Sequence, residues 1–115
     1  MKILLFIVSF VSIFQHSNDP NILGTWNTLE DNTKIEITEQ RGVLIGKIKS
    51  SDNPKAQVGK LILKDLIKSG NSWTGKIFAV KKNEWYDVEI NSKQNNLNLK
   101  IQVGFVHKNL TWKRL

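Results

Sequence analysis

The feature that most constrains the fold is an alternation of apolar and polar residues with a period of two, which continues through most of the chain after Pro20. The clearest example is the segment 97–103, in which leucine, isoleucine and valine alternate with asparagine, lysine and glutamine. A period of two is typical of a β-strand with one buried face, whereas a helix repeats every 3.6 residues. The chain beyond the first 21 residues is therefore predicted to be all β.

Turn-forming residues separate about eight strand-like segments. The predicted strands cover 22–28, 34–38, 43–49, 61–67, 73–80, 85–90, 97–103 and 110–115. The segments 50–59 and 104–109 are predicted to be loops, and Pro54 excludes a central strand in the first of them. Short connections predict an antiparallel meander, and such a sheet has two exposed edges unless it closes. The predicted fold class is all-β, a small closed up-and-down barrel of about eight antiparallel strands.

The segment 73–90 is predicted to form a hairpin. A two-residue turn at 82–83 would pair Ile77 with Val88 on one face and Lys76 with Glu89 on the other. The inward face of this hairpin would contain Trp73, Ile77, Tyr86 and Val88. The outward face would contain Phe78, Val80 and Trp85, with Lys81 and Lys82 at the turn.

The first residues are typical of a secretory signal peptide. A basic start at Lys2 precedes the apolar run 3–14, which is too short to span a bilayer because spanning takes about 20 residues. We predict a signal peptide over 1–17 with cleavage near Ser17, a linker over 18–21 and one domain over 22–115. The alternatives are a retained N-terminal anchor or a buried helix. Secretion or delivery to the periplasm is expected, and the absence of cysteine excludes a lipoprotein signal.

Composition narrows the classes of chemistry further. A chain of 115 residues has room for one domain, and the absence of cysteine excludes disulfides, cysteine-ligated zinc and thiol catalysis. Without Lys2 the chain has 16 Lys and Arg residues against 10 Asp and Glu residues, a net charge of +6. This excess favours acidic partners or anionic surfaces. The lysines are scattered, however, which favours the simpler interpretation of a solvated exterior.

Residues that could support catalysis are few. The chain has two histidines, and His16 lies within the predicted signal peptide. The other, His107, lies in a predicted loop with no serine motif near it. The carboxylates of Glu36, Asp87 and Glu89 fall on the outward side of their strands, where carboxylates are usually solvated and paired with lysine. Catalytic carboxylates need burial in a cleft, which nothing in the sequence indicates. No cluster of metal ligands and no glycine-rich phosphate loop is present in the sequence. The chain is therefore predicted to be non-enzymatic, with no metal and no cofactor.

The two ends of the domain carry residues suited to closing a barrel. Closure would place the first strand, with Gly24 and Trp26, beside the last strand, with Trp112 and Arg114. A guanidinium stacked on an indole is worth roughly 0.5 to 2 kcal/mol. These four residues are interpreted as structural.

Gly24-x-Trp26 with Arg114 on the last strand resembles the lipocalin and calycin signature. The order and spacing of further motifs is similar to a family of secreted bacterial proteins called domain of unknown function 2147 (DUF2147). These motifs are Ile35-Glu36-Ile37, Leu44-x-Gly46-x-Ile48, Asn53-Pro54, Trp73-x-Gly75-x-Ile77, Tyr86 and Thr111-Trp112-x-Arg114. The resemblance implies a lipocalin-like barrel and export, without a settled biochemical activity.

This chain departs from the family's pattern in two loops. The segment 52–61 is shorter and lacks the family's arginine-containing stretch, and the segment 78–85 lacks the proline and glycine of the usual hairpin. Because both loops would lie at the rim of the barrel, no ligand specificity is carried over from the family.

Two functions remain open. The first is binding of a small apolar ligand inside the barrel, with Trp73, Tyr86, Ile77 and Val88 as lining residues. An eight-stranded barrel can also be filled by its own side chains, in which case no internal pocket exists. The second is an envelope-associated module that contacts a protein or an anionic surface through Phe78, Val80, Lys81, Lys82 and Trp85. Nucleic acid is not expected as a partner, and a monomer or weak dimer is expected.

Overall fold

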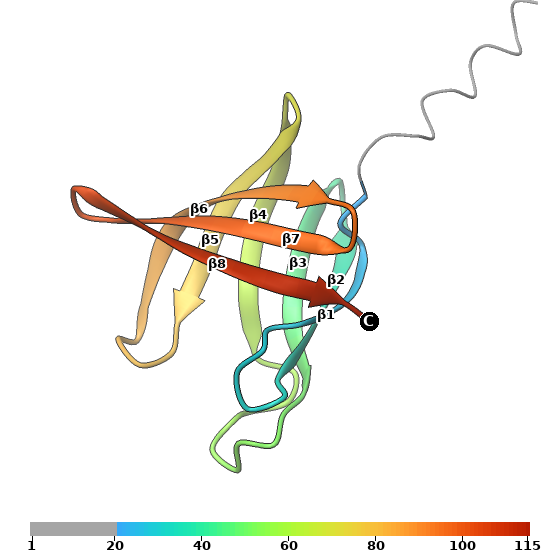
Figure 1. Ribbon diagram of the computed structural model, residues 1–115, viewed down its shortest axis with the longest axis vertical. Helices are drawn as coiled ribbons and strands as arrows, with labels where there is room; N and C mark the ends of the chain where they lie inside the picture. The colour runs from blue at the N-terminus through green and yellow to red at the C-terminus, as the bar shows by residue number, and fades with distance from the viewer. Residues whose placement is uncertain (1–20) are drawn as a thin grey trace, which may run out of the picture.

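The computed structural model describes residues 21–115, so the predicted signal peptide and linker residues 18–20 lie outside the described part. Eight strands follow one another (Figure 1). Their bounds are β1 Gly24–Asn27, β2 Lys34–Gln40, β3 Val43–Ser50, β4 Leu61–Ser69, β5 Ser72–Ala79, β6 Glu84–Lys93, β7 Asn96–Val103 and β8 Val106–Arg114. No helix in the described residues is long and apolar enough to cross a membrane.

The strands form a closed antiparallel barrel in which each strand pairs with its neighbour in sequence and β8 returns to β1. The predicted fold class is confirmed. Turns β1–β2, β3–β4, β5–β6 and β7–β8 share one end of the barrel, which we call the mouth end. The other three turns and both ends of the described chain lie at the opposite end, which we call the seam end.

The seam end is closed by the contacts of Trp26 and Arg114, which are paired across β1 and β8. The Arg114 guanidinium lies 4.2 Å from the centre of the Trp26 ring, and it donates hydrogen bonds to the carbonyl groups of Leu23 and Asn21. The Trp26 indole donates to the carbonyl of Ile22 at 2.9 Å. These bonds hold the segment before β1 across the barrel end, where Ile22 is fully buried.

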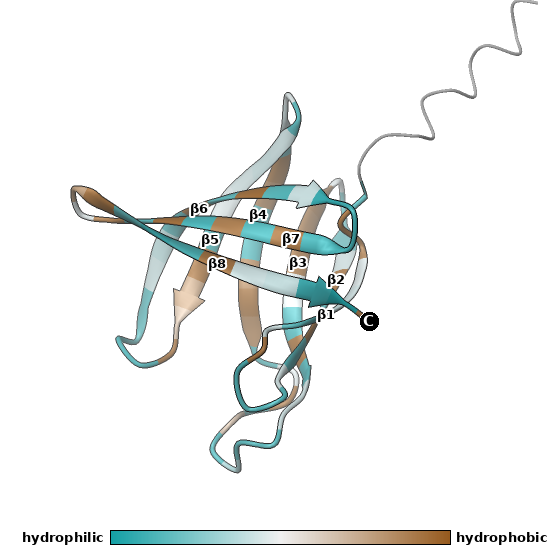
Figure 2. Cartoon of the chain, viewed as in Figure 1, coloured by the Kyte–Doolittle hydropathy of each residue, from teal (hydrophilic) through white to brown (hydrophobic). Residues whose placement is uncertain are grey.

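The core is the inward face of the strands, visible as the alternation of brown and teal along them in Figure 2. The buried side chains are all apolar in the described part of the chain. They are Ile22, Trp26, Ile35, Ile37, Leu44, Ile45, Ile48, Ile62, Leu63, Leu66, Ile77, Val88, Ile90, Leu97, Leu99, Ile101 and Trp112. A molecule in contact with this core would therefore meet mainly hydrocarbon, apart from the indole N–H groups of the tryptophans.

The hairpin register predicted for β5 and β6 is wrong by two residues. Ile77 pairs with Tyr86 instead of Val88, because the turn contains four residues, 80–83, instead of two. Asn83 has a φ of 56° and its amide donates to the carbonyl of Ala79, which closes the longer turn. A shift of two residues leaves every side chain on its predicted face, since successive side chains alternate between the faces.

The same shift changes the ion pair on the outward face. Lys76 bonds Asp87 at 2.6 Å and does not pair with Glu89. Two predicted loops are also shorter than expected. The β7–β8 turn is 104–105, because β8 begins at Val106, and the β6–β7 turn is 94–95. Both hairpins are therefore longer than the alternation of apolar residues indicated.

The fourth strand contains a bulge at Asp65, whose φ is 56°. The bulge explains why the apolar alternation of this segment is irregular. Opposite it lies Gly75, where an added Cβ would come within 2.6 Å of the Lys64 carbonyl oxygen. A glycine is thus required at this position of β5 for the bulge to form.

Candidate ligand-binding mouth

Three half-buried apolar side chains lie on the inward face toward the mouth end. They are Tyr86 on β6, Val103 on β7 and Leu110 on β8, and all three pack against the core. Each follows the parity of a buried neighbour, Val88, Ile101 and Trp112 respectively, so each points inward. Val103 pairs with Val106 near the tip of the β7–β8 hairpin, whereas Leu110 pairs with Leu99, four residues along β8 toward the seam end. We call Tyr86, Val103 and Leu110 together the mouth cluster.

The mouth cluster is partly exposed because the β7–β8 hairpin leaves the barrel wall there. In residues 21–115, β6–β7 pairing ends at Val88 with Ile101, and the first residues of β6 have no β7 partner. On the other side, β8 pairs with β1 only through Lys113 and Arg114. The far half of the hairpin therefore extends beyond the wall, as Figure 1 shows at the left of the view.

The Tyr86 hydroxyl is the polar group of the mouth cluster. It donates a hydrogen bond of 2.8 Å to Glu84 Oε1, two residues earlier on the same face. This hydrogen bond, then partial burial and the negative charge of Glu84, raise the pKa of Tyr86 above its ordinary value of 10.0. Tyr86 therefore remains a neutral phenol at physiological pH, with its ring toward the core and its hydroxyl at the rim.

The four residues predicted to bind a ligand do not all lie together. Ile77 pairs directly with Tyr86, and Val88 is two residues further along β6, so these three form one group. Trp73 pairs with Ile90 toward the seam end, about 13 Å from Ile77 at 3.3 Å per residue. In the described structure, its indole Nε1 is buried and has no hydrogen-bond partner. The Lys68 ammonium lies 5.7 Å from its ring centre.

The predicted outer-face residues divide into two environments. Phe78 and Trp85 are half-buried and stack with ring centres 5.1 Å apart. Lysine ammonium groups cover them, Lys60 at 4.6 Å from the Phe78 ring and Lys64 at 4.2 Å from the Trp85 ring. By contrast, Val80, Lys81 and Lys82 are exposed in the β5–β6 turn. Part of each aromatic surface is thus already occupied by a cation from β4 or the residue before it.

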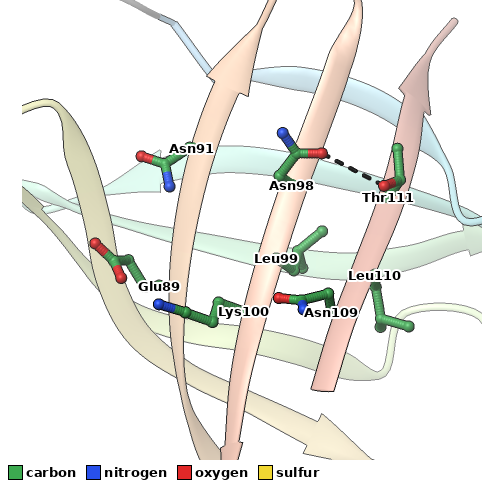
Figure 3. A pocket seen from close by; sticks show the side chains of 8 residues that line it. All are labelled: Glu89, Asn91, Asn98, Leu99, Lys100, Asn109, Leu110 and Thr111. Carbon is green, nitrogen blue, oxygen red and sulfur yellow. Dashed lines mark hydrogen bonds between the residues drawn. The ribbon is translucent and has the colours of Figure 1, made fainter. Parts of the chain in front are cut away.

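A shallow depression of about 230 Å³ lies on the outer face of β6, β7 and β8 (Figure 3). Polar side chains line it, including Glu89, Lys100 and Asn109. Its amides are partly engaged, since Thr111 donates to Asn98 at 3.4 Å and Ser72 to Asn91 at 2.7 Å. Glu89 and Lys100 are opposite each other on neighbouring strands.

A second depression of about 760 Å³ adjoins the first along the outer face of the sheet. Both include Glu89 and Lys100, and the second extends to Asp65 on β4 and His107 on β8. His107 is exposed there, and the described residues contain no cluster of three His, Cys, Asp or Glu side chains that could hold a metal. Neither depression lies on the inward face that the sequence favoured for a ligand.

Two residues of the mouth cluster were not among the predicted site residues. Val103 has the inward parity of its strand in the sequence, but nothing local indicates that its strand leaves the wall. Leu110 was assigned to the first position of a closing strand, whereas it is the fifth residue of β8. Leu110 is two residues from Trp112, and this spacing in the sequence could have indicated that both side chains share the inward face.

The comparisons with known proteins agree on the architecture. The family model described as an uncharacterized protein conserved in bacteria (DUF2147) matches residues 24–114. The solved structure of HP1028 from Helicobacter pylori, a protein described as belonging to the lipocalin family, superposes with a TM-score of 0.68 at 22% sequence identity. The match covers 84% of this chain and 84% of HP1028, and it shows a lipocalin-like barrel fold. No curated protein matches the chain.

Proposed function

This chain belongs to the DUF2147 family, and we propose that it is a non-enzymatic barrel that binds a small apolar molecule at its mouth. The molecule would contact the mouth cluster, with Ile77 and Val88 beneath it. A lipocalin-like fold is consistent with ligand binding, since eight-stranded barrels are wide enough to hold one small ligand.

One observation carries the proposal: Tyr86, Val103 and Leu110 are half-exposed apolar groups on an inward face, beside strands that are no longer paired to the wall. Covering such groups with a ligand removes apolar surface from water, at roughly 25 cal/mol per Å². The unpaired far half of the β7–β8 hairpin can move without breaking pairing to β6 or β1. Entry of a ligand there would cost little.

The chemistry around the mouth cluster sets the class of ligand. The buried residues beneath it are all apolar in the part of the chain that the structure describes, so the body of the ligand would be largely hydrocarbon. At the rim, the Tyr86 hydroxyl and Glu84 carboxylate are a donor and acceptor pair, and Lys108 is exposed on the same hairpin. A single polar end on the ligand would fit this rim, as pockets are commonly apolar with a few orienting polar groups.

Binding of a neutral apolar fluorophore, N-phenyl-1-naphthylamine, tests the site. Val103→Ser should weaken binding by about 1 kcal/mol, because it removes a contact from the mouth cluster and adds a hydroxyl. Ile67→Ser is the matched control, since Ile67 is exposed on the outer face of β4. Equal affinities of these two variants would refute the assignment of the mouth cluster.

Native mass spectrometry of protein purified from its own host tests whether the barrel carries a bound small molecule there. A retained small molecule of apolar character is the expected result. A bare chain, together with no fluorophore binding by the wild type, would leave a barrel filled by its own side chains and would reject the proposal.

We also propose that the protein is secreted or periplasmic after cleavage of a signal peptide near Ser17. The support is the basic start and the apolar run 3–14 in the sequence. The N-terminus of protein recovered from the periplasm or medium tests this directly. A mature chain that still begins at Met1 would favour a retained anchor.

A further inference from the structure

Two turns at the mouth end each present apolar residues followed immediately by basic ones. The β5–β6 turn contains Val80-Lys81-Lys82, and the β7–β8 hairpin contains Phe105-Val106-His107-Lys108 at its tip. All of these side chains are exposed. Phe105 is completely exposed, and Val80 and Val106 are 60% and 63% exposed. We call these two segments the apolar–basic tips.

The position of the β7–β8 tip makes its exposure unusual. The hairpin projects beyond the barrel wall, and Figure 2 colours its turn brown, toward the hydrophobic end of the scale. Gly104, with a φ of 64°, forms the turn, and its carbonyl accepts a hydrogen bond of 2.7 Å from the Gln102 side chain. The turn is therefore ordered by its own bonds, and Phe105 is not needed to stabilise it. An exposed phenylalanine without a structural role indicates a contact surface.

The formally charged side chains of the β7–β8 hairpin are all basic. The sequence 96–115, which covers β7 and β8, contains no aspartate or glutamate and four lysine or arginine residues. The β5–β6 turn adds Lys81 and Lys82, and its neighbouring carboxylate, Glu84, is engaged by Tyr86. The remaining acidic residues of this end are Glu30 and Asp31 in the β1–β2 turn, Asp52 in the β3–β4 loop, and Asp87 on β6, which is paired with Lys76. The apolar–basic tips are thus complementary to an anionic surface.

We propose that the apolar–basic tips dock the barrel on the surface of an anionic phospholipid bilayer. Phe105 and Val106 would enter the boundary between headgroups and acyl chains, while Lys108, Lys81 and Lys82 contact phosphate groups. An aromatic group with adjacent lysines gives the two contributions, burial and charge, that reversible membrane binding requires. Because the tips are at the mouth end, docking would direct the mouth cluster toward the lipid.

A lipid surface fits these tips better than a folded protein partner does. A protein interface buries a contiguous patch, about 800 Å² on each side. Here the exposed apolar groups are on separate projecting turns, and the aromatic pair of the outer face is already covered by Lys60 and Lys64. Separate apolar projections with lysines can enter a soft interface independently of one another.

Co-sedimentation with vesicles tests docking on the mature chain. We expect binding to mixed phosphatidylcholine and phosphatidylglycerol vesicles, little binding to phosphatidylcholine alone, and weakening as salt is raised. Phe105→Ser should weaken binding roughly tenfold, because the apolar contact is lost. Lys108→Gln should weaken it roughly fivefold, the contribution of one lysine near an anionic surface.

Matched controls are available at the seam end. Leu115→Ser removes an exposed apolar side chain, and Lys93→Gln removes an exposed lysine beside the β6–β7 turn. Both should bind as the wild type does. Failure of the wild type to bind anionic vesicles, or equal binding by Phe105→Ser and Leu115→Ser, would overturn the proposal. Docking is independent of ligand binding, so Val103→Ser can lose the fluorophore while vesicle binding is unchanged, and the reverse holds for Phe105→Ser.

Discussion

At the scale of single residues, Tyr86 shows how the barrel changes the chemistry of a side chain. Its ring packs on the core and its hydroxyl donates to Glu84, so the neutral phenol is favoured over the phenolate. The pKa of Tyr86 is accordingly raised above 10.0. The chain has one tyrosine, so the absorbance change of tyrosinate formation reports on this group alone.

We predict that Glu84→Gln lowers the pKa of Tyr86 toward 10.0, because the substitution weakens the hydrogen bond from the phenol and removes the charge that opposes the phenolate. The measurement is a titration of tyrosinate absorbance in the folded protein. Glu89→Gln, on the outer face, is the control and should leave the curve in place. A curve that does not move in Glu84→Gln would mean that the hydrogen bond is not formed in solution.

The same bond predicts a direction for stability at high pH. The folded chain holds the Tyr86 proton more tightly than the unfolded chain, so this contribution to stability is present below pH 10.0. It is lost as the pH rises through the higher pKa of the folded state. Between these values the wild type should lose more unfolding free energy than Glu84→Gln, as denaturant midpoints would show.

At the scale of elements, a β-bulge in β4 sets how this strand pairs with β5. Asp65 adds one residue to β4, and the bulged backbone approaches Gly75 so closely that no Cβ fits. The inward side chains Leu63 and Leu66 are three residues apart and both fully buried, which regular alternation does not permit. The bulge thus places Leu66 on the inward face together with Leu63.

Gly75→Ala is expected to destabilise the protein by about 2 kcal/mol, since the Cβ would collide with the backbone at Lys64 and Asp65. Asp65→Gly is the informative partner, because glycine adopts a φ of 56° without strain and should leave stability unchanged or slightly raised. Chemical denaturation of both variants measures this. Equal losses in the two would show that the bulge is not present in solution.

At the scale of the whole molecule, closure depends on a short seam. β1 pairs with β8 at two positions only, so the Trp26 and Arg114 contacts contribute much of what joins the first strand to the last. Arg114 also bonds the segment that carries the buried Ile22. The seam end is closed by these contacts, while the mouth end is open enough to leave three inward groups half-exposed.

Arg114→Ala should lower stability by about 2 kcal/mol through loss of the ring contact and the two carbonyl bonds. For a domain of this size that corresponds to a fall in Tm of roughly 10 °C. Fluorophore affinity should be nearly unchanged, because the mouth cluster is at the other end. A loss of affinity at constant Tm would instead place Arg114 in a binding site.

Except in β4, where the bulge at Asp65 breaks the alternation, the face that each strand buries could be predicted from the sequence, because alternation is a local property. The barrel was predicted from the short connections, and the family from the spacing of the motifs. Even the wrong register of the β5–β6 hairpin kept Ile77, Tyr86 and Val88 on the inward face, since the error was two residues. Absence of cysteine and the composition likewise follow from the sequence alone.

Only the tertiary structure decided where along the barrel each inward residue lies. It separated Trp73 from the partner of Tyr86 by four residues along β5, and it added Val103 and Leu110 to the mouth cluster. Only the tertiary structure also showed that β4 bulges at Asp65 and that β1 and β8 pair at just two positions. These features depend on pairing between strands and on turn lengths, and a period of two cannot distinguish registers that differ by two residues.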